Sequence, residues 1–372
     1  MKKKAVIAGH ICIDITPIFP ESAVGSVQRL LEPGKLVQVG AADMHTGGAV
    51  ANTGIAMKLM GIDVKLAGKI GADPFGSNIL SILKKYDAQK DMIVDEQAST
   101  SYSIVLAVPG TDRIFLHNPG ANDSFCKNDL DPDKLSDVQL FHFGYPPLMR
   151  KMYENDGEEL VGMFREIHGR GIITSLDFAA VDPESEAGKQ DWEKILRRVL
   201  PYVDFFVPSM EELSFMVDRK LYQEWQERAA GRDIAEVIRK EEIYHLGELL
   251  TEMGASNMLI KCGSCGFYYH MADSKKLAPV EKRLGRSLED WYEKEGFESC
   301  YRPERVLSGT GAGDTMIAAF LAALLQDYSL KDTLHLASAA GAACVENIDA
   351  LSGVRPLEEL MERIRQGWEK SS

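Results

Sequence analysis

Short apolar runs alternate with helix-like stretches along nearly the whole chain, and this alternation constrains the fold more than any other feature. Helix-like segments such as 158–168 and 192–200 separate the runs. Such alternation is typical of βαβ units, whose strands form a mainly parallel sheet. The sequence therefore predicts an α/β protein with a doubly wound sheet. The apolar runs lie at 5–8, 64–67, 140–143, 172–176, 205–207 and 258–261.

Two segments fit this pattern less well, namely residues of about 15 to 45 and of about 97 to 118. Their apolar and polar residues tend to alternate with a period of two, most clearly in 100–108 and 113–117. A period of two is typical of strands with one exposed face. We therefore expect a small β lid that is set apart from the main sheet.

The charge balance and the lengths of the apolar runs limit the partners. The 372 residues include 56 acidic and 42 basic ones, which gives a net charge of −14 without a long basic run. This balance argues against nucleic acid as a partner. No apolar run approaches the roughly 20 residues that span a bilayer. The basic amino terminus lacks the apolar region of a signal peptide, so we expect a cytoplasmic protein that does not bind membranes.

The six cysteines are scattered along the chain, as is typical of reduced thiols. The pair Cys262 and Cys265 has the spacing of half a zinc site, but no second pair with ligand spacing accompanies it. We interpret this spacing as incidental.

Two further segments, 216–250 and 272–300, are rich in charged residues with occasional tryptophan and tyrosine. Charge runs usually form the solvated faces of surface helices. We interpret both segments as such helices, with 272–300 as an insertion, and a partner surface remains an alternative.

A glycine-rich loop, Ser308-Gly-Thr-Gly-Ala-Gly-Asp314, leads directly into an apolar helix. Alternating glycines let the backbone approach a ligand closely, and the start of a helix directs N–H groups and a positive dipole end at an anion. The loop lacks the Gly-Lys-Ser/Thr of a Walker A motif and the full dinucleotide-binding pattern. It therefore predicts a phosphate site of another kind.

The carboxylate of Asp314 has two interpretations. Beside a bound phosphate, its negative charge is costly unless it accepts a proton from an attacking hydroxyl. Aspartate is also a common helix cap. The loop alone leaves both interpretations open.

The loop resembles the carboxy-terminal signature of the PfkB, or ribokinase-like, carbohydrate kinases. The segment 47–53, Gly-Gly-Ala-Val-Ala-Asn-Thr, is similar to the family's amino-terminal signature, and Gly61 closes its helix. Intermediate motifs follow in the family's order, and the resemblance covers nearly the whole chain. It implies a single domain over 1–372 with a three-layer α/β/α fold and a small β lid. The intermediate motifs are 69–76, 117–122, 208–212 and 261–266.

The resemblance also implies residue roles. Asp314 corresponds to the general base, and the amides of Gly311, Ala312 and Gly313 correspond to the anion hole for the transferring phosphoryl group. Glu212 corresponds to the glutamate that organises Mg²⁺ through water. The expected substrate-binding residues are Asp14, Gly48, Asn52 and Asn122, and the expected nucleotide-binding residues are Ser209, Lys261, Gly263, Gly266, Thr310 and Asn347.

The purine pocket is expected to include Ala339 to Ala343 together with Asn347. A run of alanines on a helix is more often tight core packing than a ligand wall. Both interpretations of this run therefore stay open.

The chain departs from the family pattern at several positions. Ser308 replaces an aspartate near the family's monovalent cation site, so activation by K⁺ is left open. Ser209 replaces the asparagine of an Asn-x-x-Glu motif, and Cys12 replaces an asparagine of ribokinases. Asp177 is not followed by the Asn-x-Arg of fructokinase relatives. Residues on or near the lid could select the substrate, namely His10, His45, Arg113, His117 and Asn122.

The resulting hypothesis is an ATP-dependent sugar kinase that uses Mg²⁺ and phosphorylates a hydroxymethyl oxygen. A nucleoside kinase on the same scaffold and a catalytically silent regulator are the alternatives, and a dehydrogenase is a more distant one. The resemblance further implies a possible homodimer through the lid. The departures leave the identity of the sugar open.

Overall fold

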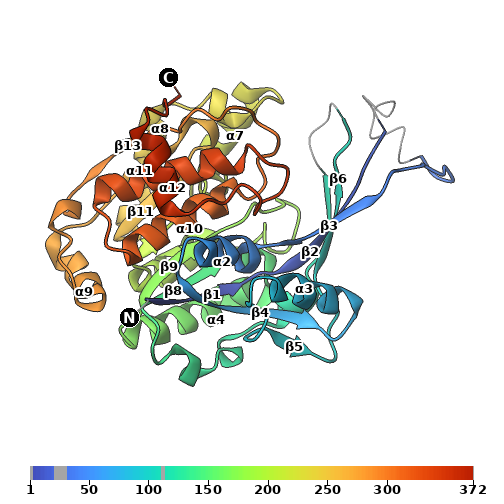
Figure 1. Cartoon of the computed structure of the whole chain (residues 1–372), viewed down its shortest axis with the longest axis horizontal. Helices are drawn as coiled ribbons and strands as arrows, with labels where there is room; N and C mark the ends of the chain where they lie inside the picture. The colour runs from blue at the N-terminus through green and yellow to red at the C-terminus, as the bar shows by residue number, and fades with distance from the viewer. Residues whose placement is uncertain (1–2, 21–31, 110–113, 372) are drawn as a thin grey trace.

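A nine-stranded sheet forms the centre of the molecule in the computed structural model, which describes residues 3–20, 32–109 and 114–371 (Figure 1). Its strand order is β13-β12-β11-β10-β9-β8-β1-β4-β5, and the strands from β11 to β5 pair in parallel. The strands β12 and β13 are antiparallel additions at one edge. The bounds are β1 (Lys4–Gly9), β4 (Asp63–Gly71), β5 (Ile93–Asp95), β8 (Leu140–Gly144), β9 (Ile173–Asp177), β10 (Phe205–Phe206), β11 (Asn257–Lys261), β12 (Phe267–His270) and β13 (Glu295–Glu298).

Helices cover both faces of this sheet, as the sequence predicts. Along β1, Ala5 and Ile7 join one buried cluster, whereas Val6 and Ala8 join another. Because successive side chains of a strand point to opposite faces, the two clusters are the two core layers. The first layer packs under α2 (Ala49–Leu59), α3 (Pro74–Lys84), α9 (Ser274–Leu284), α10 (Ala312–Leu325), α11 (Leu330–Cys344) and α12 (Leu357–Arg365). The second packs under α4 (Arg150–Gly169), α5 (Trp192–Val199), α6 (Met210–Val217), α7 (Arg219–Ala229) and α8 (Lys240–Glu252).

A second, four-stranded sheet projects from the body, at the upper right of Figure 1. It confirms that a small sheet stands apart from the main one. Parts of the two segments from which we expect the lid, 21–31 and 110–113 with Arg113, lie outside the described residues. Its strands are β3 (Ala42–Gly47), β2 (Cys12–Pro17), β6 (Tyr102–Leu106) and β7 (Ile114–Asn118), in that spatial order.

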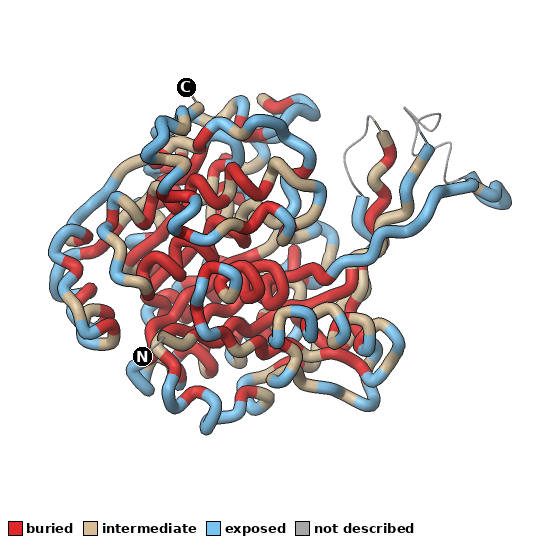
Figure 2. The backbone as a smooth tube through the Cα atoms, in the orientation of Figure 1, coloured by how far each residue is buried: buried red, intermediate tan, exposed pale blue. Residues whose placement is uncertain are grey.

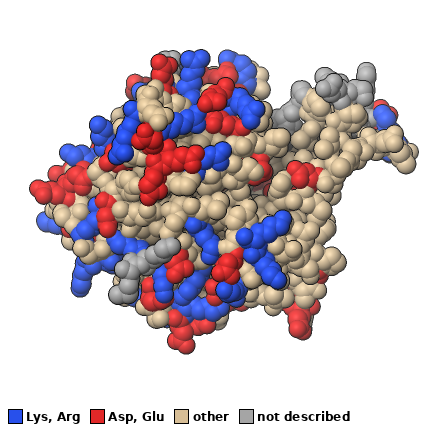
Figure 3. Space-filling view, in the orientation of Figure 1, with Lys and Arg blue, Asp and Glu red and all other residues tan. Residues whose placement is uncertain are grey.

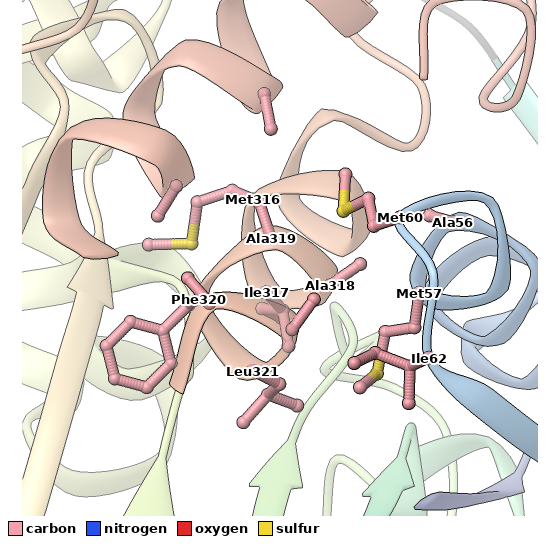
Figure 4. Close-up of a cluster of buried hydrophobic side chains, with 14 of the residues drawn as sticks. Ala56, Met57, Met60, Ile62, Met316, Ile317, Ala318, Ala319, Phe320 and Leu321 are labelled. Atoms are coloured by element: carbon pink, nitrogen blue, oxygen red, sulfur yellow. The ribbon is translucent and has the colours of Figure 1, made fainter. Parts of the chain in front are cut away.

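Helices α2 and α10 pack against each other over the first core layer (Figure 4). The close-up shows Met57, Met60 and Ile62 on the side of α10 that carries Ala318. Apolar contacts of this kind fix how two helices are placed along each other. The packing therefore brings the start of α10 beside the start of α2, where the two signature motifs lie.

The charge-rich segments have buried faces as well as solvated ones (Figure 2). In 216–250, the helices α7 and α8 bury Trp225 and Leu246. In 272–300, α9 buries Leu277, and β13 forms an edge of the main sheet. Each segment thus contributes to the core of the domain, and the interpretation of 272–300 as an insertion stays a prediction.

In the part of the chain that the structure describes, no helix is long and apolar enough to cross a membrane. All six cysteines are free thiols, and Cys262 is buried whereas Cys265 is exposed.

Candidate active site

Asp314 lies in the first turn of α10 and is 5% exposed. Its Oδ2 accepts a hydrogen bond of 3.0 Å from Asn52 Nδ2, and its Oδ1 accepts one of 3.2 Å from Thr53 Oγ1. The capping residue of α10 is Gly311, no side chain caps the helix, and Asn52 and Thr53, which bond to the Asp314 carboxylate, both belong to α2. The interpretation of Asp314 as a helix cap is therefore wrong, because its oxygens face α2 instead of the amides of its own helix.

Tyr145 is a member of this cluster that the sequence reasoning missed. Its hydroxyl donates to the Asp314 carboxylate and lies 2.8 Å from both oxygens. Burial, followed by the nearby Asp314 and Asp177, raises the pKa of Tyr145 well above its ordinary value, so the hydroxyl keeps its proton. The residue follows β8 in a left-handed conformation with φ of 69°. Its position just past a parallel strand was the available signal, because ligand sites collect at that edge.

A buried ion pair between Lys261 and Asp177 lies beside the glycine loop that precedes α10. Lys261 Nζ is 2.6 Å from Asp177 Oδ1, and the two side chains are 14% and 1% exposed. Burial raises the pKa of Asp177 to about 8 against the lowering effect of Lys261, with Glu212 and Asp314 adding to the rise. The carboxylates outnumber the ammonium group, so this region is short of positive charge. A cation is the kind of ligand that would relieve it.

Glu212 belongs to this acidic group and also caps a helix. Its Oε2 accepts from the Ser209 amide at 2.8 Å, while Ser209 Oγ accepts from the Glu212 amide at 3.3 Å. This reciprocal pair starts α6. Burial is the largest effect on Glu212 and raises its pKa, although Lys261 opposes the rise.

The glycine loop holds the start of α10 open to a ligand. Gly311 has φ of 78°, and a Cβ there would lie 2.2 Å from Ala350 Cβ, so a larger residue does not fit. A Cβ at Gly313 would lie 3.7 Å from Lys261 Nζ, which places the ammonium next to the helix start. The Ala312 amide donates to Gly309 O at 3.3 Å. A helix dipole and an ammonium group are both features that would favour a phosphate group.

Two adjacent glycines make room for polar side chains on the other side of Asp314. A Cβ at Gly47 would lie 2.2 Å from Asp14 Oδ2, and a Cβ at Gly48 would lie 2.6 Å from His10 Nδ1. Burial raises the pKa of Asp14, whose Oδ1 accepts a 3.3 Å hydrogen bond from Cys12 Sγ. Both side chains therefore lie directly against the amino-terminal signature.

The two asparagines among the expected substrate ligands differ in their contacts. Asn52 donates to Asp314, but its Oδ1 is buried without a hydrogen-bond partner among the described residues. Asn122 donates from Nδ2 to Ile11 O at 2.9 Å and accepts from the Ile11 amide at 3.3 Å. Its side chain holds the turn between β1 and β2, and its contact with substrate stays a prediction.

Of the expected nucleotide residues, Gly263, Gly266 and Asn347 lie in the loops that follow β11 and α11, whereas Thr310 lies in the glycine loop before α10. Gly263 and Gly266 adopt positive φ angles of 56° and 106° in the turn between β11 and β12. Asn347 donates from Nδ2 to Ala343 O at 3.3 Å. The Thr310 amide donates to Ser308 Oγ at 3.1 Å within the loop.

The candidate purine wall is itself tightly packed. Four of the residues from Ala339 to Ala343 belong to the first core cluster, and the exception is Gly341, which is partly exposed. Exposed apolar side chains lie nearby, because the Leu307 amide bonds to Val345 O at 2.8 Å just after α11, and Val306, Leu307 and Ile348 are all exposed.

The histidines near the small sheet have different environments. His45 is 47% exposed and pairs with Asp43 at 2.7 Å. His117 Nδ1 lies 3.1 Å from Ser103 Oγ. His10 is only 2% exposed, and its ring centre lies 5.2 Å from that of His117.

Taken as chemistry, these groups combine a fixed carboxylate, a helix start and a buried ammonium. A hydroxyl placed against Asp314 could lose its proton there while a phosphoryl group is held by the helix start and Lys261. The carboxylates of Asp177 and Glu212 are oxygen donors of the kind that Mg²⁺ prefers.

Comparison with known proteins is in line with this chemistry. A family model described as pfkB family carbohydrate kinase matches residues 2–355. An uncharacterized sugar kinase of Archaeoglobus fulgidus is 23% identical over 305 residues, which is 81% of this chain and 98% of the relative.

Solved structures with the same fold include the ribokinase of Arabidopsis thaliana complexed with ribose and ATP. It has a TM-score of 0.72 at 18% identity and covers 97% of this chain and 98% of its own. The Methanocaldococcus jannaschii nucleoside kinase, an archaeal member of the ribokinase family, has a TM-score of 0.66 at 18% identity with 98% of both chains covered. The expected ribokinase-like fold is thereby confirmed.

Proposed function

The chain belongs to the pfkB family of carbohydrate kinases, and from that membership we propose that it transfers the γ-phosphoryl group of ATP to a hydroxymethyl oxygen of a sugar. Phosphotransfer to a sugar alcohol group is the activity of the family, whereas the donor, the acceptor atom and the residue roles are the proposal. The observation that carries them is Asp314 itself. Its carboxylate is fixed by Asn52, Thr53 and Tyr145 at the positive end of α10.

In the proposed mechanism, Asp314 takes the proton from the attacking hydroxyl. Because Tyr145 and Asn52 hold both carboxylate oxygens, little reorganisation is needed when the proton moves. The amides of Gly311, Ala312 and Gly313 stabilise the charge on the transferring phosphoryl group. Lys261 lies beside Gly313 and adds a positive charge there.

The residues also fit Mg²⁺ and ATP. Glu212 would hold the metal through water, and the excess of buried carboxylates around Lys261 supports a cation at this place. The metal would draw the phosphate oxygens together and neutralise their charge. Ser209, Thr310, Gly263, Gly266 and Asn347 would contact the nucleotide. The exposed side chains of Val306, Leu307 and Ile348 would cover the base.

On the acceptor side, Asp14, Gly48 and Asn52 would bind the sugar hydroxyls, because they surround the approach to Asp314. Asn122 would contribute by holding the turn that carries His10 and Ile11. Activation by K⁺ is left open by Ser308.

A homodimer through the small sheet is part of the proposal. Three successive residues of the edge strand β7, Ile114, Phe115 and Leu116, are between 39% and 57% exposed, and Ile18 and Leu36 add apolar surface. Ile114 and Leu116 point to one face of β7 and Phe115 to the other, and exposed apolar side chains on an edge strand favour an interaction site. A second copy of the same surface would cover it.

The nucleoside kinase alternative is favoured by one observation, the ring of Tyr145 beside that of His10 at 6.0 Å between centres. Such a wall could stack on a nucleobase. A silent regulator would have no use for a carboxylate fixed at the helix start, which favours an active enzyme.

The deciding experiment is a panel of sugars, polyols and nucleosides assayed by coupled ADP formation with MgATP. We expect turnover on a sugar or polyol, with and without K⁺. We further expect Asp314→Asn to lower kcat by about 10²- to 10⁴-fold, because the base is lost. ATP binding by calorimetry should persist, since the loop amides remain. Near-wild-type turnover of this variant would refute the base assignment.

A further inference from the structure

His10 occupies the turn between β1 and β2 and points toward the acceptor side. Its Nδ1 lies against Gly48, since a Cβ on that glycine would approach to 2.6 Å. Its amide bonds to Gly144 O at 3.1 Å, which holds the turn beside Tyr145. The ring centres of His117 and Tyr145 lie 5.2 Å and 6.0 Å away. The imidazole therefore lies between Gly48 of the amino-terminal signature and Tyr145, which contacts Asp314.

Neither ring nitrogen of His10 has a hydrogen-bond partner among the residues that the structure describes, although the residue is only 2% exposed. An unpaired buried polar atom costs about 1–3 kcal/mol. Asn52 Oδ1 is a second unpaired buried atom in the same region. Two elements thus direct unsatisfied polar groups toward the place where the acceptor would bind.

The imidazole of His10 is neutral. Burial, with a further contribution from His117, lowers the pKa of His10 well below its ordinary value. Burial also lowers the pKa of His117, although Asp123 opposes this. A neutral imidazole has one N–H donor and one nitrogen acceptor. A hydroxyl group, which both donates and accepts, is its natural complement, whereas an anion uses only the donor.

The negative charge of Asp14 on the acceptor side also disfavours the binding of an acidic ligand. Asp14 carries a largely buried carboxylate, and no lysine or arginine lies within ion-pair distance of it among the described residues. A second carboxylate or a phosphate bound here would bury an uncompensated negative charge. Uncharged hydroxyls could satisfy His10 and Asn52 at no such cost.

We propose that His10, assisted by His117, determines specificity by hydrogen-bonding a hydroxyl of an uncharged polyhydroxyl acceptor, so that neutral sugars or polyols are accepted and sugar acids or sugar phosphates are rejected. This inference rests on the proposed function, because it concerns the acceptor of the same reaction. It explains why a polar ring is buried unpaired beside Gly48.

The test uses matched acceptors with the full chain and MgATP. Each neutral sugar or polyol is paired with the acid formed by oxidising one terminal carbon, and with its terminal phosphate. The inference requires a neutral member to exceed its acid and its phosphate by about 100-fold or more in kcat/KM. A better rate on an acid or a phosphate overturns it while leaving the kinase function intact.

The variant His10→Phe keeps a flat ring of similar size and removes both hydrogen-bonding atoms. It should lower kcat/KM for the neutral acceptor by about 10- to 100-fold, mainly through KM, and leave the KM for ATP unchanged. His10→Asn, which keeps a donor and an acceptor, should recover part of the loss. The matched control is His245→Phe, because His245 is 49% exposed on α8 and outside the site. Equal kinetics of His10→Phe and wild type would overturn the inference.

Two measurements separate this inference from the proposed function. If no acceptor is phosphorylated, calorimetric binding of the neutral acceptors to wild type and to His10→Phe still decides. Binding that His10→Phe loses supports the inference although the function has failed, and equal or absent binding overturns it. If thermal melting shows that His10→Phe is unfolded, His117→Phe replaces it, with the same expected rise in KM and the same overturning result.

Discussion

The two sides of Asp314 treat their polar groups differently. On the phosphoryl side, which we define as Asp177, Glu212 and Lys261 with the start of α10, the charged groups contact one another or backbone amides. On the acceptor side, defined as His10, Asp14, Asn52 and His117, polar atoms of His10 and Asn52 are buried without partners among the described residues. On the surface, Figure 3 shows charges spread over the body and few on the visible face of the small sheet.

This contrast assigns the chemical step to the phosphoryl side and the selection of the substrate to the acceptor side. A phosphoryl group meets the same demands in every cycle, so its site can be assembled in advance from the protein's own ion pairs. An acceptor is recognised by groups that stay unsatisfied until the right partner arrives, and such groups reject a ligand that cannot pair with them. The phosphoryl side should therefore control stability and kcat, and the acceptor side should control KM for the sugar.

The largest effect is expected from Lys261→Met. At pH 9, above the pKa of about 8 of Asp177, removing the ammonium leaves the Asp177 carboxylate buried without its 2.6 Å partner, beside Glu212. Breaking a buried ion pair from one side lowers the free energy of unfolding by about 3 kcal/mol or more. Denaturant unfolding would measure the loss, and the KM for ATP should rise in the same variant.

The control for Lys261→Met is the same substitution at Lys194, which pairs with Asp156 at 2.8 Å but is 53% exposed. An exposed pair contributes about 1 kcal/mol or less. The double variant Lys261→Met with Asp177→Asn should recover stability, because the uncompensated charge is gone. If Lys261→Met and Lys194→Met lowered the free energy of unfolding equally, the distinction between the two sides would be wrong.

The phosphoryl side was the more predictable from the sequence. Gly311 to Asp314 form a contiguous motif with a local physical reason, and the structure places Lys261 beside it. Tyr145 was missed because it contacts Asp314 across 169 positions of the chain, and its position just past β8 indicates a ligand site but not which residue it contacts. The unpaired state of His10 was equally hidden, since burial on all sides depends on elements that only the folded chain assembles.

The strand pattern was readable for a similar reason. Runs such as 140–143 and 258–261 are buried on both faces, so their apolar character is continuous and their limits lie within about a residue of β8 and β11. The charge-rich segment 272–300 was harder to interpret. Its many charged residues indicate a solvated surface, yet Leu277 and Trp291 within it are buried in the core.

A smaller effect concerns pH, and its sign differs between the two sides. The pKa of Asp177 is raised from 3.8 to about 8, so the folded chain keeps a proton that the unfolded chain loses, and stability falls as the pH rises through this window. The pKa of His10 is lowered from 6.5, so the unfolded chain binds the extra proton, and this contribution is lost as the pH falls below about 6.5.

Melting temperatures between pH 5 and pH 9 would test the two signs. Compared with wild type, Asp177→Asn should lose less stability toward alkaline pH, and His10→Asn should lose less toward acidic pH. Only the differences in slope matter, because other carboxylates add to the acid side, such as Asp73, whose pKa is lowered. Variants with the slopes exchanged would contradict the assignment.

The smallest effect is expected from Phe115→Asp on the edge strand β7, where Phe115 is 57% exposed. If a second copy covers this surface, a buried charge there disfavours the dimer, and sedimentation should show a monomer. The control is Leu59→Asp, at 42% exposure near the far end of α2. The same variant also tests how far the small sheet supports the acceptor side. Because β7 carries His117 and pairs with β6, loss of the dimer should loosen the acceptor side alone. The KM for the sugar should then rise a few-fold, while kcat and the KM for ATP stay unchanged. A change in the KM for ATP instead would show that the small sheet supports both sides.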